Sequence, residues 1–98
     1  MEKTYSTGLK LTYHHISEME HYLDIAGFHK IEKEDVFSNF ANYYENKNYN
    51  GVIIIPKPNT SIYKHSKKLV FRLMGVRDKE EFDALDNLIN NLINSIHH

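Results

Sequence analysis

The sequence predicts an α+β fold, in which a small antiparallel or mixed β-sheet carries two or three helices on one face and ends in a long C-terminal amphipathic helix. Three observations support this fold class. The C-terminal segment has helical periodicity, residues 9–13 alternate apolar and polar side chains, Leu69, Phe71 and Leu73 recur at every second position, and residues 52–55 form a β-branched run. A chain of 98 residues has the length of one domain, so we expect residues 1–98 to form a single α+β domain.

The C-terminal segment, from Asp78 to His97, has the clearest pattern. Its apolar residues recur every three or four positions, which is the period of an amphipathic helix. They are Phe82, Leu85, Leu88, Ile89, Leu92, Ile93 and Ile96. Asp78 and Glu81 have the spacing of a capping box, which would satisfy free amide groups in the first helical turn.

A strand is expected near the N-terminus. Leu9, Leu11 and Tyr13 alternate with polar residues, as the side chains of a half-buried strand do. A bulge at Gly8 would let this strand begin earlier, near Tyr5.

A short helix is expected to follow this strand. Ser17 has the residue type of an N-cap, with Glu20 three positions later. Gly27 is the expected left-handed stop, after which Phe28 would pack back onto Leu23.

The middle of the chain permits two interpretations. Residues 28–33 are a weak strand candidate. Phe37, Phe40 and Tyr44 suit a helix capped by Asp35, whereas a tyrosine-rich strand entering a hairpin is the alternative. We favour the helix for residues 35–44.

Two further strands are predicted in the second half. Asn50-Gly51 is a tight-turn signal, and the β-branched run at residues 52–55 is typical of a strand buried on both faces. Residues 56–60 contain two prolines and predict a loop. Leu69, Phe71 and Leu73 alternate with Val70, Arg72 and Met74 and predict a strand that ends at Gly75.

Composition and motifs argue against several functional classes. The 12 basic and 13 acidic residues balance, and the absence of cysteine excludes disulfides and thiolate metal sites. No signal peptide or membrane span is recognisable, so we expect a cytoplasmic protein with no membrane partner. The sequence has no nucleophile elbow, phosphate loop, dinucleotide glycine pattern or His-Glu-x-x-His motif, so we expect neither enzymatic activity nor a cofactor.

Residues 57–79 carry a local excess of positive charge, with seven basic residues and one acidic residue, Asp78. Basic side chains beside an aromatic ring can grip a phosphate backbone while the ring stacks on a base. The alternatives are a surface for an acidic protein partner and a solvated strand edge whose lysines discourage pairing. With the tyrosines of the middle segment, the candidate partner-binding residues are Tyr43, Tyr49, Lys57, Tyr63, Lys64, Lys67, Lys68 and Arg72.

The apolar face of the C-terminal helix is broader than contact with one sheet requires. It predicts either a helix wedged inside its own domain or a homodimer interface. The candidate interface residues are Leu88, Ile89, Leu92, Ile93 and Ile96.

Histidines provide one further candidate site. Glu18 and His21 have the spacing of a carboxylate–imidazole metal pair on a helix, but no second such pair is present in the sequence, so we expect no metal centre.

Together these patterns predict a small non-enzymatic binding protein. We expect it to act as a stoichiometric regulator or inhibitor of a protein or a protein–nucleic acid partner. The alternative is a nucleic-acid-binding module that uses the basic segment 57–79.

Overall fold

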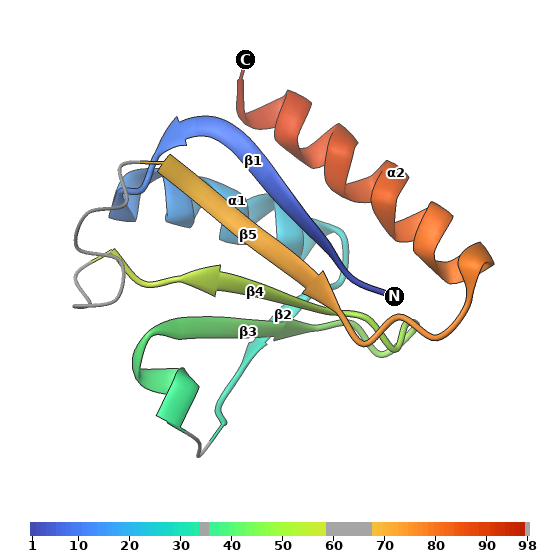
Figure 1. Ribbon diagram of the computed structural model, residues 1–98. Helices are drawn as coiled ribbons and strands as arrows, with labels where there is room; N and C mark the ends of the chain where they lie inside the picture. Colours follow the sequence, from blue (N-terminus) through green and yellow to red (C-terminus); the bar gives the residue numbers. More distant parts are fainter. Residues whose placement is uncertain (34–35, 59–67, 98) are drawn as a thin grey trace.

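The computed structural model describes residues 1–33, 36–58 and 68–97 (Figure 1). Its elements are β1 (Lys3–Lys10), α1 (Tyr13–Ile25), β2 (His29–Ile31), the 3₁₀ helix η1 (Val36–Asn39), β3 (Ala41–Glu45), β4 (Val52–Pro56), β5 (Lys68–Met74) and α2 (Lys79–Ile96). The five strands form one sheet in the order β1-β5-β4-β3-β2, and every neighbouring pair is antiparallel. The predicted α+β fold is confirmed, with two α-helices in the described part of the chain and a sheet that is antiparallel rather than mixed.

Both α-helices lie on the same face of the sheet. Because side chains alternate along a strand, residues paired across the sheet share a face. One such row consists of Lys3, Leu73, Ile53, Tyr44 and Lys30. Tyr44 donates a hydrogen bond to Glu20 of α1, and Lys3 forms an ion pair with Asp86 of α2. We call this side of the sheet the covered face and the opposite side the open face.

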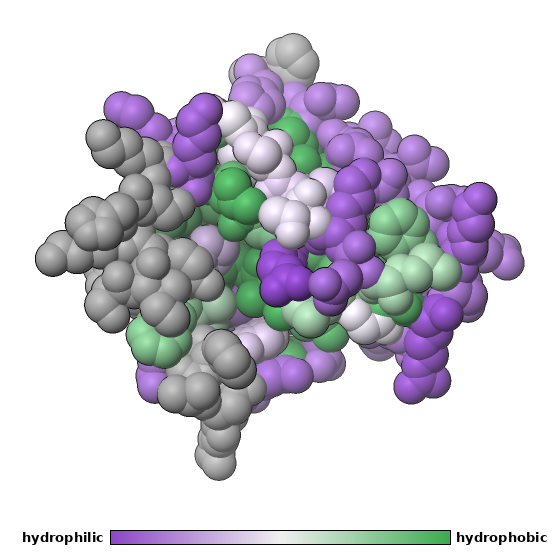
Figure 2. All heavy atoms as spheres, in the orientation of Figure 1, coloured by the Kyte–Doolittle hydropathy of each residue, from purple (hydrophilic) through white to green (hydrophobic). Residues whose placement is uncertain are grey.

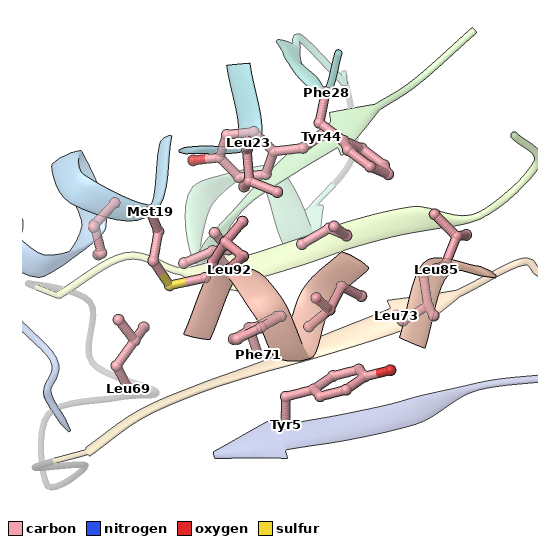
Figure 3. Packing of buried hydrophobic residues seen from close by; sticks show 14 of the residues in the cluster. Tyr5, Met19, Leu23, Phe28, Tyr44, Leu69, Phe71, Leu73, Leu85 and Leu92 are labelled. Atoms are coloured by element: carbon pink, nitrogen blue, oxygen red, sulfur yellow. The ribbon is translucent and has the colours of Figure 1, made fainter. Parts of the chain in front are cut away.

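The hydrophobic core fills the space between the covered face and the helices (Figure 3). Its fully buried side chains come from α1, from the central strands and from α2. They include Met19, Leu23, Ile53, Ile55, Leu69, Phe71, Leu73, Leu85 and Ile89. Gly51, just before β4, lets α2 approach closely, since a Cβ there would lie 2.7 Å from Cδ1 of Leu85.

The boundary between β1 and α1 differs from the prediction. The strand ends at Lys10 and the helix begins at Tyr13, so Leu11 and Tyr13 do not continue the strand. The N-cap is Thr12 rather than Ser17, and its hydroxyl accepts a hydrogen bond from the His15 amide at 3.1 Å. The apolar alternation runs across this cap by coincidence, which is why it extended the predicted strand too far.

Two other predictions for the first third, the earlier strand start with a bulge at Gly8 and the left-handed Gly27, are confirmed. The strand starts at Lys3, and its register with β5 shifts between Ser6 and Lys10, around Gly8 with φ of 76°. Gly27, with φ of 92°, follows the end of α1 as expected.

The predicted helix over residues 35–44 is wrong, whereas the strand alternative is correct for Ala41–Glu45. The structure describes only a short 3₁₀ helix, Val36–Asn39, before this strand. The apolar spacing fitted either element, but β3 lies between two strands and bonds to both. The predicted cap, Asp35, lies outside the described residues.

Within residues 52–55, β4 is fully buried on one face only, which corrects a second prediction. Ile53 and Ile55 have no exposed surface, whereas Val52 and Ile54 are half-buried on the open face. The β-branched run therefore marks a central strand whose second face the described residues leave partly uncovered.

The long C-terminal helix is confirmed. The Asp78 carboxylate accepts a hydrogen bond from the Glu81 amide at 2.8 Å, as a capping residue does. The Glu81 carboxylate does not return this bond to Asp78, because it accepts one from the Asn50 amide at 2.6 Å. The Glu81 carboxylate thus connects α2 to the β3–β4 loop instead of completing the capping box.

Candidate interaction face

The open face carries a row of side chains that crosses the whole sheet. Strand register places Thr4, Arg72, Ile54, Tyr43 and Ile31 side by side in this row. The neighbouring rows add further apolar residues from the central strands. The apolar residues of the open face are Ile31, Ala41, Tyr43, Val52, Ile54, Pro56, Val70 and Met74, of which Ala41 and Pro56 are buried.

These apolar side chains reach the surface to different degrees. Val70 is 36% exposed and Ile54 is half-buried, whereas Tyr43 is only 9% exposed and forms part of the floor. Seen from the side opposite α1, hydrophobic residues lie over the sheet, with strongly hydrophilic atoms among them near the middle of the view (Figure 2). The open face therefore combines apolar side chains with a hydrophilic centre.

Arg72 is the charged residue at the centre of this surface. Its Nη2 lies 2.9 Å from Oε1 of Glu2, and the two side chains are 48% and 56% exposed. Lys33 contributes a second positive charge, since its Nζ lies 5.0 Å from the centre of the Tyr43 ring. Solvent screens the exposed ion pair between Arg72 and Glu2, so Glu2 constrains the Arg72 side chain only weakly.

The structure brings together three of the predicted partner-binding residues. Tyr43, Lys68 and Arg72 all lie on the open face. Lys57 follows the end of β4, where its Nζ donates to the Ser38 carbonyl at 2.7 Å.

The remaining predicted residues are not part of this group. Tyr49 lies at the opposite end of β4, in the loop before it, and its ring stacks on Phe28 with 6.5 Å between centroids. It therefore packs against the core. Tyr63, Lys64 and Lys67 lie outside the described residues.

Three residues of the predicted dimer interface belong to the core of their own chain. Ile89 is 0%, Leu92 5% and Ile96 8% exposed, so none of them lies on the surface. Leu88 and Ile93 are half-buried at the margin of the helix. The breadth of the apolar face thus serves packing within the domain, and a homodimer through its margin stays a prediction.

Sequence reasoning missed the apolar part of the open face. The sequence pattern alone places Ile31, Ile54, Val70 and Met74 in strands and gives none of them a binding role. The signal was present in β5, where Val70 and Met74 interrupt the polar side of an alternating strand. Their meeting with Ile54 and Ile31 depends on strand order, which no local pattern contains.

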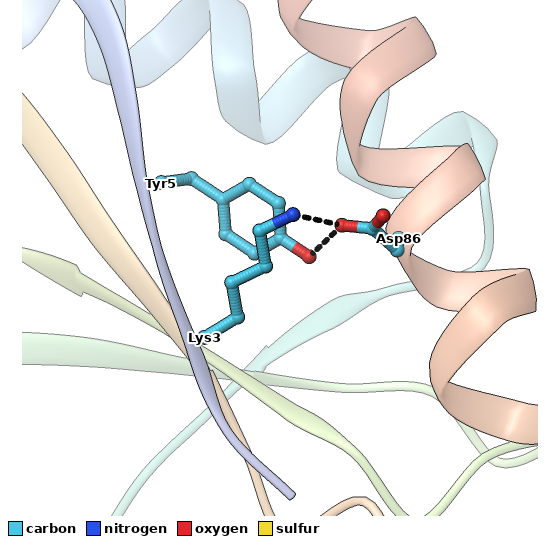
Figure 4. Close-up of polar contacts among 3 residues, drawn as sticks. All are labelled: Lys3, Tyr5 and Asp86. Carbon is cyan, nitrogen blue, oxygen red and sulfur yellow. Dashed lines mark hydrogen bonds and ion pairs between the residues drawn. The ribbon is translucent and has the colours of Figure 1, made fainter. Parts of the chain in front are cut away.

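A polar cluster on the covered face joins α2 to β1 (Figure 4). Oδ1 of Asp86 accepts a hydrogen bond from the Tyr5 hydroxyl at 2.6 Å and another from Nζ of Lys3 at 2.9 Å. Burial, and then the contact with Asp86, raises the pKa of Tyr5 far above its ordinary value. Hydrogen bonds from Tyr5 and Lys3 lower the pKa of Asp86.

A similar cluster joins α1 to β2 and β3, at the far end of the covered face from β1. Oε2 of Glu20 accepts a hydrogen bond from the Tyr44 hydroxyl at 2.8 Å and lies 3.0 Å from Nζ of Lys30. Burial is the main cause that raises the pKa of Tyr44, followed by its contact with Glu20. A tyrosine with a strongly raised pKa stays protonated, so Tyr5 and Tyr44 are suited to donating hydrogen bonds to the helices rather than to proton transfer.

The histidines of α1 form local contacts. Nε2 of His14 lies 2.9 Å from Oε1 of Glu18, one helical turn away. Within residues 1–33, 36–58 and 68–97, no group of three or more histidine, aspartate or glutamate side chains is arranged to hold a metal ion.

Neither described α-helix is long and apolar enough to cross a membrane.

Comparison with known proteins does not assign a family to this fold and surface. No family model, curated protein or solved structure matches the chain significantly.

Proposed function

We propose that this protein is a small non-enzymatic binding protein that regulates or inhibits a protein partner, or a protein–nucleic acid complex, by stoichiometric binding through the open face. The observation that carries the proposal is the apolar row at the centre of the sheet, in which Ile54 stands between Tyr43 and Arg72. A sheet with helices on one face leaves such a row available to a partner on the other.

The residue types on the open face favour a protein as the partner. Tyrosine, methionine and arginine are enriched in the centres of protein–protein interfaces, where charged residues other than arginine are depleted. A single arginine surrounded by apolar side chains is typical of the few residues that dominate binding energy. Arg72, between Ile54 and Thr4 in its row, has this environment.

The positive charge of Arg72 on the open face indicates which chemical group the partner places against it. In the free protein, Glu2 satisfies the Arg72 guanidinium through an exposed contact. An exposed ion pair of this kind contributes about 0–1 kcal/mol, so a carboxylate on the partner can replace Glu2 at little cost. We therefore expect a partner surface with an apolar centre and a carboxylate that meets Arg72.

Affinity capture from the source cell tests this proposal. The bait proteins are the wild type, Ile54→Asp and Arg72→Glu, with Lys47→Glu as a matched charge reversal on the exposed β3–β4 loop. An aspartate at position 54 would bury an unpaired carboxylate in the complex, and we expect a loss of about 100-fold or more in affinity. Lys47→Glu should bind like the wild type.

Light scattering on the purified complex then gives its stoichiometry. A complex of defined mass that the two open-face variants fail to form supports the proposal. Equal recovery of the same partner by all four baits would overturn it. Binding to labelled oligonucleotides that weakens by about one power of salt concentration per phosphate contacted would instead identify the nucleic-acid-binding alternative.

A further inference from the structure

The β3–β4 loop contains the one asparagine of the sequence that a glycine follows, Asn50 before Gly51. Asn50 is exposed, whereas Gly51 is buried. Because a Cβ at position 51 would lie 2.7 Å from Cδ1 of Leu85, packing beneath α2 favours a glycine at this position. The loop therefore joins an accessible asparagine side chain to a residue that has no side chain of its own.

An asparagine followed by glycine can lose its side-chain amide without an enzyme. The backbone nitrogen of Gly51 attacks Cγ of Asn50 and closes a five-membered imide, while the Cγ–Nδ2 bond breaks and ammonia leaves. Water then opens the imide to an aspartyl or an isoaspartyl residue. Overall, an amide and water give a carboxylate and ammonium, and nothing is oxidised or reduced. Glycine favours closure of the ring because its backbone is the least restricted.

The side-chain amide of Asn50 is weakly held. Its Nδ2 lies 3.4 Å from Oε1 of Glu81, which is long for a hydrogen bond, whereas the Asn50 backbone amide donates to the same oxygen at 2.6 Å. Asn46 in the same loop differs, since it is buried and its Nδ2 donates to the Ala26 carbonyl at 3.0 Å. Exposure, weak contact and a following glycine thus coincide at Asn50.

A carboxylate at position 50 would meet negative charge at the start of α2. Oε2 of Glu81 is buried and has no hydrogen-bond partner in the part of the chain that the structure describes. Asp78 and Glu80 border the same hollow beside the loop as Glu81 does. Like charges this close repel one another. An isoaspartyl residue would also add a main-chain carbon next to Gly51, where the core leaves little room.

We propose that Asn50 is a site of spontaneous deamidation, and that its conversion to a carboxylate loosens the β3–β4 loop from the start of α2. Water is the co-reactant. The proposal does not rest on the function proposed for the open face, because the reaction needs no partner.

Peptide mapping by mass spectrometry tests the site. The purified protein is kept at physiological temperature in mildly acidic and in alkaline buffer, and the loss of each asparagine amide is followed over days. We expect Asn50 to be converted first, into two products that separate by chromatography. Conversion should be faster in alkaline buffer, because the attacking nitrogen must lose its proton.

Asn48 is the internal control for this measurement, since it is exposed in the same loop but tyrosine follows it. Equal conversion of Asn48 and Asn50 would overturn the proposal. An Asn50 amide that persists in alkaline buffer would also overturn it.

Hydrogen exchange of Asn50→Asp tests the consequence. We expect amide hydrogens of the β3–β4 loop and of the first turn of α2 to exchange about two- to fivefold faster than in the wild type, the size expected of an exposed charge contact. Asn50→Ser, which removes the amide without adding charge, should have a smaller effect. In a Glu81→Gln background, Asn50→Asp should also accelerate exchange less, because the facing charge is gone. Unchanged exchange in Asn50→Asp, or equal acceleration in both backgrounds, would contradict the proposed loosening.

Discussion

On the covered face of the sheet Phe71 is 1% exposed and stacks on Tyr5, with 5.3 Å between ring centroids. One residue earlier on the same strand, Val70 is 36% exposed on the open face. The helices fill one side of β5, whereas apolar side chains on the other side contact water. Neighbouring residues of one strand therefore divide between holding the fold together and presenting a surface.

The polar groups of the two faces differ in the same way. On the covered face, the hydroxyls of Tyr5 and Tyr44 are bound to carboxylates of the helices. On the open face, Arg72 contacts Glu2 through side chains that are about half exposed. The first kind of contact positions helices on the sheet, and the second can be exchanged for a contact with another molecule.

The largest expected effect comes from Phe71→Ala, which removes a buried ring from the covered face. We expect the free energy of unfolding in urea to fall by about 3–5 kcal/mol. Val70→Ala, its neighbour on the open face, should change this value by less than about 1 kcal/mol. Similar losses in the two variants would contradict the division between the faces.

Gly51→Ala tests how closely α2 approaches the covered face. The added Cβ would lie 2.7 Å from Cδ1 of Leu85 and 3.0 Å from Cγ2 of Val76. We expect a loss of about 1–3 kcal/mol in thermal or urea unfolding because the core must shift. Asn48→Ala, in the same loop but with an exposed side chain, is the control, and an equally stable Gly51→Ala variant would show that this packing is loose.

Tyr44→Phe removes one hydrogen bond between the covered face and α1 while keeping the buried ring. Because its acceptor is the Glu20 carboxylate, we expect the free energy of unfolding to fall by about 1–2 kcal/mol. Tyr5→Phe makes the same change at the sheet edge, next to Asp86. Unfolding free energies unchanged in both variants would mean that the hydroxyls do not hold the helices.

Asp86→Asn should alter the pH dependence of stability. Because the folded protein lowers the pKa of Asp86, the unfolded chain binds more protons near the ordinary value of 3.8, and stability falls as pH falls through the folded pKa. At pH 7 the variant should be less stable by up to about 1 kcal/mol, and the gap should close in acid. Urea unfolding between pH 2 and 7 measures this gap; a gap that stays constant would contradict the assignment.

The smallest effect is expected on the open face. Arg72→Ala removes an exposed ion pair with Glu2, so the free energy of unfolding should change by less than about 0.5 kcal/mol. Binding to the partner should nevertheless weaken. A strongly destabilised variant would show that Arg72 supports the sheet rather than the interface.

Most of the fold follows from local patterns. The alternation in β5 and the apolar period in α2 each have a single interpretation, and the structure confirms both. The segment before β4 does not, because its aromatic spacing fits a helix and a strand equally. Residues 41–45 form a strand because they pair with both β2 and β4, and this pairing is not visible in the spacing of the segment itself.

The candidate interaction face could be predicted only in part. Tyr43 and Arg72 stand out as an aromatic and a basic residue, but only strand register places Ile54 between them. The partial exposure of Val52 and Ile54 could not be predicted, because an unbroken β-branched run looks the same whether one face of the strand is covered or two. The residues of this face are distant in the sequence, so residue type alone does not predict that they lie together.

The pairing of β1 with β5 also has a consequence for how the chain is made. Tyr5 and Phe71 lie side by side in the sheet although they are far apart along the polypeptide. During synthesis, β1 leaves the ribosome long before its neighbour exists, and contacts of such long range slow folding. The nascent N-terminal strand thus stays without its sheet neighbour until β5 has emerged, and an unpaired strand edge is prone to aggregation during that time.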